Sequence, residues 1–253
     1  MKYHNPIITG FHPDPSVCRV GNDFYLVNSS FEYFPGIPIY HSTDLTHWEQ
    51  IGHVLDRKNQ LKLVSGAPNC LGIYAPTIRY HEGIFYCIVT NVGGRSGGNF
   101  FVYTTNPYGR WSNPVKLPFA GIDPSLFFDE DGRIYYTGTD TGIYIAEITF
   151  DVVRNDTPKR NELPVSIQNV KCGEKHYIWN GSGGNNPEGP HLYRIHDMYY
   201  LMIAEGGTEY CHMVTIARSK NVYGPYEACP HNPVLSNRST CLNIKAVSYT
   251  HLT

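Results

Sequence analysis

The sequence has no long apolar run, no Cys-x-x-Cys pair, few methionines and little net charge. No segment approaches the roughly 18 apolar residues that a membrane span needs, and the first residues contain no apolar core of a signal peptide. A formal charge of −2 gives no reason to expect a nucleic acid partner. Seven scattered cysteines argue against a disulfide framework or a zinc site. These absences predict a cytoplasmic protein that binds neither nucleic acid nor membrane.

What the chain has in abundance is tyrosine, phenylalanine, glycine and proline, with 20, 11, 24 and 18 of its 253 residues. This mixture favours strands and turns over helices. Short runs such as DFYLVNSSF, GIFYCIVTNV and GIYIAEITF recur at close spacing between Gly, Asn and Asp. Strands of this kind indicate an all-β fold, which could be a sandwich, a barrel or a propeller.

Internal repetition decides among these three architectures. One unit of strand, tight turn and aromatic strand recurs four times, and its copies open at Asp14-Pro15-Ser16, Ala75-Pro76-Thr77, Asp123-Pro124-Ser125 and Glu188-Gly189-Pro190. A repeat of roughly 50–65 residues with about four strands is typical of a propeller blade. We therefore expect one propeller domain over residues 1–235. Residues 236–253 carry no blade pattern and are interpreted as a non-native tail.

The blade openings bring acids together. The first strand of a propeller blade lines the central channel, so Asp14, Asp123 and Glu188 are expected to converge, with the small Ala75 between them. An Asp-Pro pair alone is ordinarily a turn, but three acids at one place in three repeats favour a site. Crowded carboxylates have pKa values that split, which leaves one proton donor and one acceptor. Such a pair suits cleavage of a glycosidic bond.

Aromatic and polar side chains near the acids suit a sugar. Candidate stacking platforms and hydroxyl partners are Phe31, Tyr33, Phe34, Tyr74, Asn186 and Thr208. Most of the 31 Phe and Tyr residues must nevertheless form the core between blades.

Five stretches resemble glycoside hydrolase family 43, in the branch of bacterial β-xylosidases and xylosidase/α-L-arabinofuranosidases. They are NPIITGFHPDPSVCRVGNDFYL, IYAPTIRY, GIDPSLFFDEDG, PEGPHLY and AEGGTEY, and the resemblance covers about residues 5–235. It implies a five-bladed β-propeller, here truncated after about four blades. It also implies an inverting glycosidase that removes terminal xylose from β-1,4-xylo-oligosaccharides.

The same resemblance implies roles for individual residues. Asp14 would be the general base that activates water, and Glu188 the general acid that protonates the leaving oxygen. Asp123 would tune the pKa of Glu188 and help to orient it. The pocket for the terminal sugar would be shaped by Phe31, Tyr74, Ala75 and Thr208. The family usually has Trp where this chain has Tyr74.

Several alternatives stay open at this point. The enzyme could be an α-L-arabinofuranosidase that acts on arabinoxylan oligosaccharides, a glycoside phosphorylase, or a non-catalytic carbohydrate-binding propeller. No cofactor is required; a structural calcium ion in the channel, suggested by analogy with the family, is left open. The sequence also leaves open whether the truncated chain folds and is active, and whether the full-length protein forms a homo-oligomer.

Overall fold

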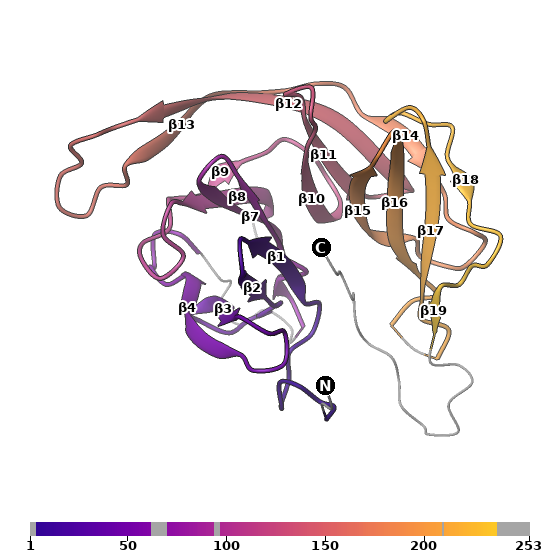
Figure 1. Ribbon diagram of the computed structural model, residues 1–253, viewed down its shortest axis with the longest axis horizontal. Helices are drawn as coiled ribbons and strands as arrows, with labels where there is room; N and C mark the ends of the chain where they lie inside the picture. Colours follow the sequence, from indigo (N-terminus) through magenta and orange to yellow (C-terminus); the bar gives the residue numbers. More distant parts are fainter. Residues whose placement is uncertain (1–3, 62–69, 94–96, 209, 237–253) are drawn as a thin grey trace.

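The computed structural model describes residues 4–61, 70–93, 97–208 and 210–236. Every regular element in these residues is a β-strand, and the strands form four antiparallel sheets (Figure 1). Within this part of the chain, no helix is long and apolar enough to cross a membrane. The all-β prediction is confirmed, and each sheet corresponds to one of the four predicted blades.

The first two blades hold the N-terminal half of the strands. Blade 1 contains, in order across the sheet, β1 (Ser16–Val20), β2 (Asp23–Val27), β3 (Gly36–Ser42) and β4 (Glu49–Leu55). Blade 2 contains β5 (Gly72–Ile73), β6 (Thr77–His81), β7 (Ile84–Val92), β8 (Gly98–Thr104) and β9 (Val115–Lys116). Its innermost strand is split, because β5 and β6 both pair with β7.

The other two blades have five strands each. Blade 3 contains β10 (Ile122–Phe128), β11 (Ile134–Thr139), β12 (Ile143–Arg154), β13 (Val165–Cys172) and β14 (His176–Trp179). Blade 4 contains β15 (Glu188–Ile195), β16 (Met198–Glu205), β17 (Met213–Ser219), β18 (Glu227–Ala228) and β19 (Leu235–Ser236). The last strand includes Ser236, and residues 237–253 of the predicted tail lie outside the described residues.

Apolar side chains between facing blades hold the sheets together. One buried cluster joins blades 1 and 2 around Ile39 and Ile78, and a second joins blades 2 and 3 around Phe101 and Tyr136. A third joins blades 3 and 4 and includes Leu201. The inner strands β1, β6, β10 and β15 therefore lie next to one another in that order, as the predicted propeller requires.

The strands β12 and β13 extend beyond their own blade. Figure 1 shows the pair reaching across the top of the view towards β9. Val165 and Ile167 of this hairpin pack on the blade 2 side chains, and the backbone N–H of Ile167 donates to the Tyr103 hydroxyl at 3.0 Å. The arm thus braces blade 3 against blade 2 on the outside of the molecule.

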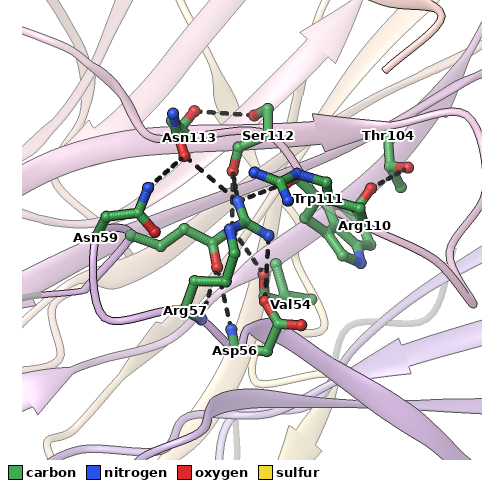
Figure 2. A network of polar contacts seen from close by, with 10 residues as sticks. Val54, Asp56, Arg57, Asn59, Thr104, Arg110, Trp111, Ser112 and Asn113 are labelled. Carbon is green, nitrogen blue, oxygen red and sulfur yellow. Dashed lines mark hydrogen bonds and ion pairs between the residues drawn. The ribbon is translucent and has the colours of Figure 1, made fainter. Parts of the chain in front are cut away.

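A polar network locks blades 1 and 2 at their outer edges (Figure 2). The Arg57 guanidinium donates to the carbonyl of Trp111 at 2.8 Å, and Asn59 donates to Asn113 at 3.3 Å. Gln60 reaches the carbonyl of Ser112 at 2.8 Å. These bonds run from the end of blade 1 to the β8–β9 loop of blade 2, so they fix the angle between the two blades that carry the aromatic wall described below.

Candidate active site

One cavity brings the predicted site residues together. It has a volume of about 390 Å³ and lies at the entry ends of the inner strands. Its lining includes the seven residues to which the family resemblance assigns a role, namely Asp14, Phe31, Tyr74, Ala75, Asp123, Glu188 and Thr208. The remaining lining residues, which the sequence analysis missed, are Phe11, Pro13, Cys70 and Ile122.

A larger cavity of about 580 Å³ has a different character. Residues from the far ends of the inner strands and from β16 and β17 line it, among them Arg79, Phe127 and Tyr193, and no carboxylate takes part. The Arg79 guanidinium there contacts the buried His191 ring at 2.6 Å. Of these two cavities, only the smaller one is therefore lined by carboxylates.

The two aspartates at the blade openings share one backbone conformation. Asp14 and Asp123 have a left-handed backbone with φ of 54°, and each is followed by proline and then by a buried serine. In blade 3 a β-bulge places Asp123 and Pro124 opposite Gly138, between the pairs Ile122–Thr139 and Ser125–Thr137. The repeated Asp-Pro-Ser tripeptide is thus one structural device used in two blades.

In blade 4 the acid does not occupy the position that Asp14 and Asp123 occupy in their blades. The residue with left-handed backbone before Pro190 is Gly189, with φ of 60°, and the bulge lies between the pairs Glu188–Ala204 and His191–Met202. Glu188 therefore precedes the position of Asp14 and Asp123 by one residue and corresponds to Tyr74 and Ile122. The expectation that Glu188 occupies the same blade position was wrong, because the proline and not the acid sets the register. Its side chain still lines the same cavity.

Asp14 has a carboxyl group whose pKa is raised by its surroundings. It is 7% exposed, and burial raises the pKa of its carboxyl to about 6, with a further upward contribution from the nearby charge of Glu188. A hydrogen bond from the Ser29 hydroxyl and the neighbouring His212 act in the opposite direction on this pKa. Asp14 can therefore change its protonation state near neutral pH.

Hydrogen bonds fix the backbone on both sides of Glu188. The preceding carbonyl, of Pro187, accepts from the Thr139 hydroxyl at 2.8 Å, and the following N–H, of Gly189, donates to Asp123 at 3.1 Å. The Pro190 carbonyl accepts from Thr137 at 3.1 Å. Asp123 thus holds the chain segment that carries Glu188.

Two aromatic rings form one wall of the cavity. Phe31 and Tyr74 meet edge to face with ring centroids 5.6 Å apart, and Phe11 lies 6.0 Å from Phe31 on the outer side. A β-bridge between Phe31 and Ile73 joins blades 1 and 2 at this point. A side chain at Gly72 would come within 2.2 Å of the Phe31 carbonyl oxygen, so the approach of the two blades requires glycine there.

The other expected sugar contacts have mixed outcomes. Ala75 packs on Ala204 of blade 4, and its short side chain leaves the cavity open. Tyr33 and Phe34 are exposed and do not line the cavity, and neither does Asn186. Phe11 was missed because an exposed aromatic before the first blade carries no repeat signal.

In the part of the chain that the structure describes, no three His, Cys, Asp or Glu side chains are grouped so that they could hold the calcium ion that the sequence leaves open. The guanidinium of Arg79, a half-buried residue, lies against the His191 ring on the inner strands. Its positive charge disfavours a second cation at that level. No step of the chemistry proposed below is routed through a metal.

The family model of glycosyl hydrolases family 43 matches residues 3–249. The chain belongs to this family. A curated relative from Bacteroides ovatus, "Non-reducing end alpha-L-arabinofuranosidase BoGH43B", is 48% identical over 93% of this chain and 42% of its own length. The "Beta-xylosidase" of Bacillus subtilis is 41% identical over 94% of this chain and 44% of its own length.

Solved family 43 structures share the fold. "Bacteroides ovatus Xyloglucan PUL GH43B" superposes with a TM-score of 0.80 at 46% identity, over 94% of this chain and 44% of that one. A xylan β-1,4-xylosidase from Bacillus halodurans also gives 0.80, at 38% identity, over 94% of this chain and 45% of that one. The family 43 propeller fold is therefore established for this chain. The chain spans less than half the length of these relatives.

Proposed function

We propose that the protein is an inverting glycoside hydrolase that removes terminal xylose from β-1,4-xylo-oligosaccharides. The observation that carries the proposal is the meeting of three carboxyl groups from three blades in one small cavity, where Asp14 and Glu188 interact electrostatically. Inverting glycosidases need one carboxylate to activate water and one carboxylic acid to protonate the leaving oxygen.

Asp14 acts as the general base. Its carboxyl group, with a pKa raised to about 6, is ionised at neutral pH and is a stronger base than an ordinary aspartate. Ser29 holds it in place by a hydrogen bond. Water between Asp14 and the anomeric carbon loses its proton to this carboxylate as it attacks, so the configuration at that carbon inverts.

Glu188 acts as the general acid on the opposite side of the scissile bond. Asp123 contributes a negative charge that favours the protonated form of Glu188, and it also holds the N–H of Gly189. For this division of work the two carboxyl groups of Asp14 and Glu188 should be about 6.5–9.5 Å apart.

The cavity supports cleavage at the end of an oligosaccharide. Its volume of about 390 Å³ is at the small end of the range for ligand pockets, roughly 300–1,000 Å³. Phe31 and Tyr74 offer faces for a sugar ring, Thr208 offers a hydroxyl, and Ala75 leaves room. These features suit one terminal pentose rather than the middle of a polymer.

An α-L-arabinofuranosidase acting on arabinoxylan oligosaccharides is the second candidate. It is favoured by the name of the Bacteroides ovatus relative, an α-L-arabinofuranosidase, while the Bacillus subtilis relative is named a β-xylosidase. A non-catalytic carbohydrate-binding propeller is the third, and the retained acids argue against it. A cytoplasmic location and independence from cofactors, nucleic acid and membranes are further parts of the proposal.

The experiment uses the full-length gene product and the p-nitrophenyl glycosides of β-D-xylose and α-L-arabinofuranose. We expect hydrolysis that needs no phosphate, with higher kcat/KM on the xyloside and inverted product by NMR. Asp14→Asn and Glu188→Gln should each lower kcat/KM on xylobiose by at least about 1,000-fold. Unchanged hydrolysis in both variants would refute the assignment, and preference for the arabinoside would favour the second candidate.

A further inference from the structure

A fourth carboxylate, Glu205, lies behind the site and does not line the cavity. It is the last residue of β16, and its side chain is fully buried. Each carboxylate oxygen accepts one backbone N–H, from Ser182 on one oxygen and from Gly184 on the other, both at 2.7 Å. The Thr215 hydroxyl adds a third donor at 2.6 Å. Backbone and hydroxyl donors therefore satisfy this buried acid.

The loop that donates these bonds is shaped to close on the carboxylate. A Cβ atom at Gly181 would come within 2.7 Å of the Glu205 carboxyl carbon. At Gly184 it would come within 2.7 Å of a Glu205 oxygen and 2.5 Å of the Met213 methyl carbon. The glycine-rich sequence Gly181-Ser182-Gly183-Gly184 thus has a specific purpose, which is close approach to Glu205.

This loop leads directly into the proposed general acid. After Gly184, the Asn185 carbonyl accepts from the N–H of Gly206 at 2.6 Å, and the Pro187 carbonyl accepts from Thr139. Glu188 follows at once. The segment from Gly181 to Pro187 is therefore held at several points, and Glu205 holds its first half through Ser182 and Gly184.

We propose that Glu205 is a positioning residue for the general acid. It fixes the Gly181–Pro187 segment so that the carboxyl of Glu188 reaches the leaving oxygen in the productive place. This inference rests on the proposed function, in which Glu188 protonates that oxygen. Displacement of a catalytic group by about 1 Å costs on the order of 100-fold in rate.

Glu205→Gln tests the anchor without creating a cavity. Either orientation of the amide turns an NH₂ group towards one of the two loop N–H groups, so one of them loses its acceptor. Gly184→Ala disturbs the same contact from the side of the loop, because the added Cβ would push the loop away from Glu205. It replaces the first variant if that variant does not fold. Asp129→Asn is the matched control, because Asp129 is a buried carboxylate just beyond the opposite end of inner strand β10.

The experiment measures how kcat/KM of the full-length protein depends on the leaving group of the substrate. General acid catalysis matters for xylobiose, whose leaving group is a sugar hydroxyl, and hardly matters for 2,4-dinitrophenyl β-xyloside. We expect Glu205→Gln to lower kcat/KM about 10- to 100-fold on xylobiose and less than about 3-fold on the aryl substrate. Asp129→Asn should affect both substrates equally.

Two outcomes would overturn the inference: an equal effect of Glu205→Gln on both substrates, or no effect on either. Hydrogen exchange at the amides of Ser182 and Gly184 reports the anchor independently of activity, and in Glu205→Gln it should accelerate more at these two amides than at the other buried amides, whereas Asp129→Asn should not single them out. If it does not accelerate, the anchor itself is refuted. Failure of the proposed function looks different, because Glu188→Gln would then show no leaving-group dependence of its own.

Discussion

Two buried aspartates, Asp129 and Asp14, lie at opposite ends of the inner strands and have opposite electrostatic surroundings. Asp129, beyond the end of β10, accepts from Arg194 at 2.8 Å, from the Tyr199 hydroxyl at 2.6 Å and from a backbone N–H at 2.8 Å. Asp14, at the cavity end, accepts from Ser29 and faces the like charge of Glu188. One carboxylate is surrounded by donors and a cation, and the other has a pKa raised to about 6.

This difference distinguishes an aspartate that stabilises the fold, Asp129, from one whose carboxyl group is available for chemistry, Asp14. A saturated carboxylate ties two blades together, since Asp129 belongs to blade 3 and both Arg194 and Tyr199 to blade 4. A carboxylate with few donors gains basicity but costs folding free energy, as is common for groups at active sites. Glu205 shows that the cavity end also contains a saturated acid, placed behind the reacting groups and not among them.

The largest loss of stability is expected from substitution of Asp129, beyond the end of β10. Asp129→Asn removes the charge that pairs with Arg194 and presents an NH₂ group to a hydrogen-bond donor. We expect the free energy of unfolding to fall by about 2–3 kcal/mol, because the amide that replaces this buried carboxylate cannot accept all three of its hydrogen bonds. Urea denaturation at pH 7 measures it. A loss below about 0.5 kcal/mol would show that Asp129 is not a structural tie.

A substitution at the cavity end, Asp14→Asn, is expected to change the free energy of unfolding in the opposite direction. In the unfolded chain Asp14 ionises near its ordinary pKa of 3.8, whereas in the fold it ionises near 6, so folding at pH 7 buries an unfavourable charge. Asp14→Asn removes that charge and should raise the free energy of unfolding by about 2 kcal/mol at pH 7. The gain should fall as the pH is lowered through 6 and vanish by about pH 3, where the aspartic acid is neutral in both the folded and the unfolded chain. Equal gains at both pH values would contradict this explanation.

The sequence predicted those site residues that lie at the start of a repeated blade unit. Asp14 and Asp123 precede the proline that starts the inner strand, so their place around the ring follows from the repeat. Glu188 could be aligned on its acid or on its proline, and only the left-handed backbone of Gly189 decides between the two. Glu205 carried no signal, because its partners in residues 182–184 are brought to it by folding.

The smallest effect concerns the pH dependence of activity. Asp14 must be ionised to accept a proton, so kcat/KM for xylobiose should fall below about pH 6, by about tenfold per pH unit. Ser29→Ala removes a hydrogen bond that lowers the pKa of Asp14, so the acidic limb of the pH profile should move to higher pH. Ser42→Ala is a matched control, because Ser42 is also a buried serine of blade 1 and its hydroxyl bonds to Asp44, away from the cavity. If the limb moves to lower pH, or moves equally in both variants, Asp14 does not set it and the division of work between the two ends of the inner strands is wrong.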